Sequence, residues 1–99
     1  ETYIGLVLES EEEGYALQVY DVQGNLQFES VFDLDYRVLK FSGKNILIYN
    51  EFECIMLNSK GKIFFSGTFE ESISNLYTQS GNNRYIVMHG SRTDQIRLR

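Results

Sequence analysis

Proline and tryptophan are absent from this 99-residue chain, and alanine, cysteine and histidine each occur once. The single cysteine, Cys54, excludes an internal disulfide, and its apolar neighbours predict a small buried side chain. Because alanine is the best helix former, its near absence disfavours a helical protein. The longest apolar runs have about five or six residues, whereas a membrane-spanning helix needs roughly 20.

Positive charge is also scarce. Nine Lys and Arg residues stand against fourteen Asp and Glu residues, which gives a net charge of −5. Nucleic acids and anionic membranes both attract basic surfaces, so we expect no nucleic-acid partner. We expect contact with a membrane only through a segment outside these residues. Since the chain begins at Glu1 rather than Met, we also expect it to be a processed or partial chain.

Short strand-like runs occupy most of the sequence. Tyr15, Leu17 and Val19 alternate with polar residues, as in a half-buried strand. Residues 45–49 (Asn-Ile-Leu-Ile-Tyr) are almost entirely apolar, which predicts a strand buried on both faces. Residues 70–77 have apolar side chains at helical spacing, but the serines and asparagine among them favour a strand over a helix. The pattern therefore predicts an all-β protein.

An internal repeat organises these runs. The turn Asp21–Gly24 recurs 37 residues later as Asn58–Gly61. Apolar positions on both sides match without a gap: Leu17 with Cys54, Val19 with Met56, Leu26 with Ile63, Phe28 with Phe65 and Phe32 with Phe69. Residues 46–49 match 85–88 in a shorter third copy, and residues 4–6 match 46–48. A period of about 40 residues with four strands is typical of β-propeller blades.

We therefore predict one all-β domain over residues 1–99, a partial β-propeller of about two and a half four-stranded antiparallel blades. The blades would cover about residues 2–42, 43–81 and 82–99. A β-sandwich is the alternative. An open arc of blades would expose apolar faces and strand edges, so we expect self-association or a protein partner.

The stretch Tyr20–Phe28 (Tyr-Asp-Val-Gln-Gly-Asn-Leu-Gln-Phe) resembles WD-repeat-like and quinoprotein-like propellers. It is most similar to the extracytoplasmic propeller domains of a family of Gram-positive bacterial membrane proteins of unknown function. This resemblance implies an extracytoplasmic domain of a membrane-anchored protein, with a cytoplasmic location as the alternative. The tryptophan that docks quinoprotein blades is missing, so no quinone cofactor is implied.

No catalytic, cofactor or metal motif is recognisable in the chain. Four glutamates around residue 11 are more typical of a solvated loop than of a calcium site. On a rigid β-scaffold, binding residues concentrate in the connecting loops. The candidate binding residues are Glu11, Glu12, Glu13, Asn82, Asn83, His89 and Arg92. We expect a non-catalytic interaction or sensing domain; the alternatives are a fragment of a propeller hydrolase and a purely structural packing module.

Overall fold

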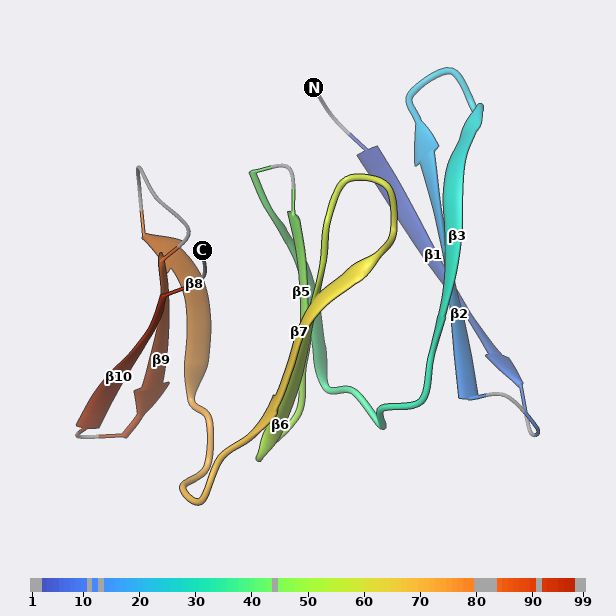
Figure 1. Ribbon diagram of the computed structural model, residues 1–99. Helices are drawn as coiled ribbons and strands as arrows, with labels where there is room; N and C mark the ends of the chain where they lie inside the picture. Colours follow the sequence, from blue (N-terminus) through green and yellow to red (C-terminus); the bar gives the residue numbers. More distant parts are fainter. Residues whose placement is uncertain are drawn as a thin grey trace.

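The computed structural model describes residues 3–10, 12, 14–43, 45–79, 84–90 and 92–97. Within this part, all regular elements are β-strands in three antiparallel sheets (Figure 1). The first sheet contains β1 (Tyr3–Ser10), β2 (Gly14–Asp21) and β3 (Leu26–Phe32). The middle sheet contains β4 (Val38–Ser42), β5 (Asn45–Tyr49), β6 (Glu53–Leu57) and β7 (Ile63–Thr68). The third sheet contains β8 (Asn75–Gln79), β9 (Arg84–His89) and β10 (Arg92–Arg97).

The all-β prediction is thus confirmed, and the helical alternative for residues 70–77 is wrong. Residues 70–74 are irregular and β8 follows them. No helix long and apolar enough to span a membrane occurs among the residues that the model describes.

The three sheets lie side by side in chain order and face one another (Figure 1). Successive side chains of a strand point to opposite faces, so the middle sheet contributes to two hydrophobic cores. The first core fills the space between the first and middle sheets: Leu17, Val19, Phe32, Leu34, Ile46, Ile48, Ile55 and Leu57. The second core joins the middle and third sheets: Leu47, Tyr49, Cys54, Met56, Ile73, Leu76, Tyr85 and Val87. Burial of residues 46–49 on both faces agrees with the prediction from their apolar sequence.

The repeated turn is reproduced in atomic detail. Asp21 Oδ1 accepts hydrogen bonds from the backbone N–H groups of Gln23 and Asn25, both at 2.9 Å. Asn58 Oδ1 accepts the same pair of bonds from residues 60 and 62, at 2.9 and 3.0 Å. A glycine with positive φ closes each turn, and each preceding strand shifts register at the matching position. The sequence repeat is therefore also a repeat of backbone conformation.

The sheets divide the chain at other places than the repeat units suggest. Residues 38–42, which the sequence assigns to the end of the first unit, pair with β5 in the middle sheet. Residues 75–79 likewise pair with β9 in the third sheet. The short connection between β4 and β5 favours a hairpin, because strands joined by a tight turn pair with each other. The fourth strand of each sequence unit thus begins the next sheet.

Candidate functional site

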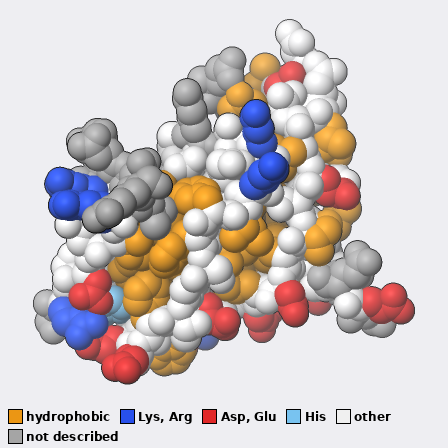
Figure 2. Space-filling view, in the orientation of Figure 1, with side chains coloured by type: hydrophobic (Ala, Val, Ile, Leu, Met, Phe, Trp, Pro, Cys, Tyr) orange, Lys and Arg blue, Asp and Glu red, His pale blue; other side chains and the backbone are white. Residues whose placement is uncertain are grey.

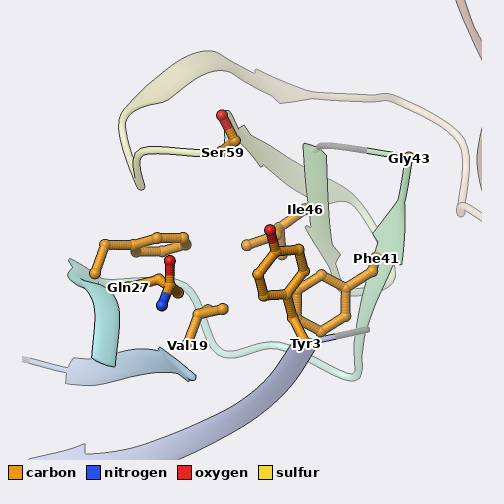
Figure 3. Close-up of a pocket in the computed structure, with 8 residues that line it drawn as sticks. Tyr3, Val19, Gln27, Phe41, Gly43, Ile46 and Ser59 are labelled. Carbon is orange, nitrogen blue, oxygen red and sulfur yellow. The ribbon is translucent and has the colours of Figure 1, made fainter. Parts of the chain in front are cut away.

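A cleft opens between the first and middle sheets, at the end where the turns β2–β3, β4–β5 and β6–β7 lie (Figure 3). Its volume is about 640 Å³. Five strands and the β4–β5 and β6–β7 turns supply its lining: Tyr3, Val19, Gln27, Phe28, Phe41, Gly43, Ile46 and Ser59. None of these lining side chains is charged. Apolar walls with a few polar groups are typical of small-molecule sites.

Aromatic rings form much of the wall. Figure 3 shows the rings of Tyr3 and Phe41 next to each other, with Gln27 across the opening and Ser59 at its rim. Tyr3 and Phe41 are 37% and 40% exposed, so both rings are accessible to a ligand. Val19 and Ile46, which are buried in the first core, form the floor. The cleft therefore opens into the first core at the end where the β2–β3, β4–β5 and β6–β7 turns lie.

Glycine shapes the rim of the cleft. Gly61 has a φ of 83° and lies against the ring of Phe28, where a Cβ atom would clash. The hydroxyl of Ser30 donates a 2.8 Å hydrogen bond to the carbonyl oxygen of Gly61. Because a larger residue would push the β6–β7 turn away from Phe28, Gly61 holds this turn in place beside the cleft.

One polar group of the lining, Gln27 of β3, is held in place by the β2–β3 turn. Gln27 Nε2 donates to Asp21 Oδ2 at 3.3 Å and to the carbonyl oxygen of Asn25 at 3.1 Å. These bonds occupy the amide nitrogen, so the amide oxygen is the group that Gln27 can offer to a ligand. The backbone N–H of Asn25 also bonds the Asp21 carboxylate, which lowers the pKa of Asp21 from its ordinary value.

At the opposite end of the molecule, His89 lies inside a polar cluster. Its side chain is fully buried and its ring packs 5.4 Å from that of Phe69. Nδ1 lies 3.2 Å from the carbonyl oxygens of both Glu71 and Ser72, and Nε2 lies 3.1 Å from Asp94 Oδ2 without the alignment of a hydrogen bond. His89 therefore fits a structural role that holds the irregular segment 70–74 against the third sheet.

Arg92 is the exposed member of the same cluster. It pairs with Glu71 Oε1 at 2.7 Å and with Asp94 Oδ2 at 2.8 Å. Both partners are acidic, so Arg92 binds this cluster together and its charge is already compensated. Glu12 is exposed, and Glu11, Glu13, Asn82 and Asn83 lie outside the described residues. Of the predicted binding residues that the structure describes, Glu12, His89 and Arg92, none lines the cleft.

Two further reactive groups have structural surroundings. Burial raises the pKa of the Cys54 thiol to about 11, so it stays protonated and is a poor nucleophile. The Tyr15 hydroxyl donates a 2.8 Å hydrogen bond to Asp35 Oδ1, and this bond raises the pKa of Tyr15 to about 12. The described residues contain no group of three His, Cys, Asp or Glu side chains that could hold a metal ion.

The sequence matches the model of a family of unknown function (DUF5711) over residues 1–98. The chain belongs to this family. No curated protein and no solved structure matches it. The resemblance to a family of unknown function is thus supported at the family level, whereas nothing in the match supports WD-repeat or quinoprotein membership.

The cleft of this DUF5711 chain is a site that sequence analysis misses. Its members are far apart in the chain, from Tyr3 to Ser59. The sequence does carry one signal for the cleft, namely the two repeated Asx turns that begin at Asp21 and Asn58. The cleft residue Gln27 follows the first turn, and the cleft residue Ser59 lies within the second. Two equivalent turns at one end of neighbouring sheets would place Gln27 and Ser59 at the same edge.

Proposed function

We propose that this chain is a non-catalytic binding module, with sheets packed as blades of a β-propeller. Face-to-face stacking in chain order, a duplicated turn and a period of about 40 residues all support this arrangement over a two-sheet sandwich. An extracytoplasmic position in a membrane-anchored protein is part of the proposal. Protease treatment of intact cells that express the full-length protein would test that position.

The observation that carries the binding role is the uncharged, aromatic-walled cleft. Acid–base catalysis needs titratable groups near the substrate, and the lining contributes none apart from the Tyr3 phenol. Aromatic walls favour the apolar face of a ligand, whereas Gln27 and Ser59 offer hydrogen bonds at the edge. A ligand that combines both features without charge, such as a sugar ring, fits this lining best.

Nuclear magnetic resonance titration of the 99-residue chain would test this role. The probes are neutral methyl glycosides, with gluconate as the charged counterpart. We expect the glycosides to shift the amide signals of residues 27, 41, 43 and 59, and gluconate to leave them unchanged. The carboxylate of gluconate would lose its hydration in this cleft without gaining a cationic partner.

A matched pair of variants separates the cleft from the rest of the surface. Phe41→Ala removes a wall of the cleft, and Phe52→Ala removes a ring of nearly the same exposure, 41% against 40%, outside the lining. We expect about a fivefold loss of glycoside affinity in the first variant, since one aromatic contact contributes about 1 kcal/mol beyond its buried area. The Phe52→Ala variant should bind like the wild type. Equal affinity in all three proteins, or no shift at the cleft, would refute the proposal.

A further inference from the structure

The first sheet has an uncovered side, which we call the outer face. Strand pairing arranges the side chains of the outer face in three rows, each with one residue from β1, one from β2 and one from β3. The rows are Ile4, Tyr20 and Leu26; Leu6, Gln18 and Glu29; and Leu8, Ala16 and Val31. Five aliphatic side chains on it are about half exposed: Ile4 at 55%, Leu6 at 48%, Leu8 at 45%, Leu26 at 53% and Val31 at 50%. Figure 2 shows hydrophobic side chains along the margin of the molecule where Figure 1 places this sheet. A contiguous patch of this kind marks an interaction surface.

The repeat identifies what kind of surface this is. Ile4 and Leu6 are the counterparts of Ile46 and Ile48 in the middle sheet. By the 37-residue repeat, Gln18 and Tyr20 likewise correspond to residues 55 and 57. Strand pairing agrees, because β1 and β2 align these residues in the same way as β5 and β6 do. In the middle sheet the four counterparts lie in the first core, covered by the first sheet. The outer face therefore matches a surface that another sheet of the same repeat covers.

The complementary surface lies at the other end of the stack. Ile86 and Met88 of β9 are the counterparts of Leu47 and Tyr49, which face the third sheet in the second core. In the third sheet these positions alternate with Tyr85 and Val87 of the second core, so they lie on the opposite, far face of that sheet. On this face Ile86 is buried and Met88 half-buried, whereas Tyr77, the partner of Ile86, is 40% exposed. Each sheet thus has a face that packs on the preceding sheet and a face that packs on the following one.

Charge distinguishes the two ends in the same sense. Residues 1–37 contain nine of the fourteen acidic side chains and a single basic one, Arg37. Residues 84–99 contain four arginines and one acidic residue, Asp94. The outer face itself carries Glu29. On the far face of the third sheet, Arg84 of β9 and Arg97 of β10 occupy neighbouring positions. Opposite charges on the two faces favour contact between unlike ends and disfavour contact between like ends.

We propose that the outer face of the first sheet binds the far face of the third sheet of a second copy of this chain. The contact is head-to-tail, so each bound copy still presents one free face of each kind to further copies. Such heterologous contacts produce closed rings or open chains instead of symmetric dimers. This inference does not depend on ligand binding in the cleft.

Sedimentation velocity on the 99-residue chain tests the proposal through two lysine variants. Leu6→Lys blocks the outer face and Tyr77→Lys blocks the far face of the third sheet. Both positions are exposed, so the fold should survive, and circular dichroism would check it. Ile63→Lys, at a residue 48% exposed on the edge strand β7, is the control that touches neither face.

The head-to-tail contact makes a distinctive prediction for mixtures. The wild type and Ile63→Lys should form species larger than dimers as concentration rises, and each blocking variant should be monomeric by itself. A mixture of the two blocking variants should form a 1:1 dimer and nothing larger, because only one good contact is available. A monomeric wild type would overturn the proposal. So would a Tyr77→Lys variant that still self-associates, since that result indicates contact between two outer faces.

Discussion

The two spaces between the sheets use the same strands of the middle sheet but are closed in different ways. Between the middle and third sheets, polar side chains meet across the gap. Asn45 donates a 2.7 Å hydrogen bond to the Tyr85 hydroxyl, and Lys40 donates a 3.0 Å bond to Asn75 Oδ1. A hydroxyl pair, Ser42 and Thr78, adds a third link. These bonds close the second core along one edge.

Between the first and middle sheets, the hydrogen bond from Ser30 to Gly61 links the two sheets, but a cleft opens beside it. Phe41 and Gly43, from the strand and turn that flank Ser42, face the first sheet there. The first sheet offers the rings of Tyr3 and Phe28 in return. The comparison shows that one repeat builds a closed interface where polar residues meet and a cleft where aromatic residues and glycine meet.

The largest expected effect is loss of either core. Leu47 and Ile48 are neighbours in β5, both 0% exposed, and point to the second and first cores respectively. We expect Leu47→Ala and Ile48→Ala each to lower the free energy of unfolding by about 2–5 kcal/mol, because each leaves a cavity. Urea unfolding measures the loss. Ile63→Ala, at a half-exposed position, is the control and should cost less than about 1 kcal/mol. If one of the two β5 variants behaved like the control, the middle sheet would not serve two cores.

Removing one polar bridge should have a smaller effect. Tyr85→Phe deletes the hydroxyl that accepts the bond from Asn45 and keeps the buried ring. We expect the free energy of unfolding to fall by about 1 kcal/mol, the typical value of such a bond. Tyr77→Phe removes an exposed hydroxyl from the same sheet as the control. If the Tyr85→Phe variant were as stable as the wild type, the hydrogen bond from Asn45 to Tyr85 would not stabilise the contact between the middle and third sheets.

The buried thiol of the second core should show in reactivity and in alkaline stability. A pKa of about 11 instead of 9.0 leaves about a hundredfold less thiolate at neutral pH, so a thiol reagent should modify Cys54 about a hundredfold more slowly than in urea. Since the folded thiol holds its proton more tightly, stability should fall as the pH rises from 9 towards 11. Fast labelling of the folded protein would contradict the closed second core.

The repeated turns offer a matched test in which only one carries a titratable cap. Asp21→Ala and Asn58→Ala each remove two hydrogen bonds to backbone N–H groups. We expect both to lower the melting temperature at neutral pH. The pKa of Asp21 is lowered in the fold, so its contribution is complete above pH 3.8 and is lost as the pH falls below that value. The effect of Asp21→Ala should therefore fade in acid while that of Asn58→Ala persists; parallel behaviour would disprove the assigned cap.

The smallest effect is expected for the exposed ion pair between Arg37 and Glu51. Its atoms are 3.7 Å apart and both side chains are about half exposed or more. Exposed pairs of this kind contribute little, so Arg37→Ala should change the free energy of unfolding by less than about 0.5 kcal/mol. If urea unfolding showed that Arg37→Ala lowers the free energy of unfolding by more than about 1 kcal/mol, the contact between segment 33–37 and the β5–β6 turn would contribute more to stability than an exposed ion pair normally does.

The sequence predicts the parts of the fold that depend on local pattern. Residues 46–48 are all apolar, and only a strand that is covered on both faces can bury three such residues in succession. The turns at Asp21 and Asn58 share a side-chain cap and a closing glycine, so their equivalence is visible in the sequence. The division into sheets is harder to predict. Leu34 and Tyr36 alternate as a strand would, yet residues 33–37 cross from one sheet to the next.

The candidate site depends on distance in space, which explains why it is not predicted. The cleft forms where Tyr3, Gln27, Phe41 and Ser59 converge from separate strands and turns. Each of these residues by itself is an ordinary strand or turn residue. His89 illustrates the reverse case: its place after an apolar strand and before a glycine suggests an accessible loop, whereas segment 70–74 and Phe69 cover its ring.

The most direct test of the stacked arrangement is a methyl-labelled nuclear Overhauser experiment on the wild-type chain. Ile48 and Leu47 are adjacent, and their methyl groups should report on different neighbours. We predict contacts from Ile48 to Leu17 or Val19 of the first sheet, and from Leu47 to Leu76 or Val87 of the third. Contacts from both residues to the same sheet would contradict a middle sheet shared by two cores.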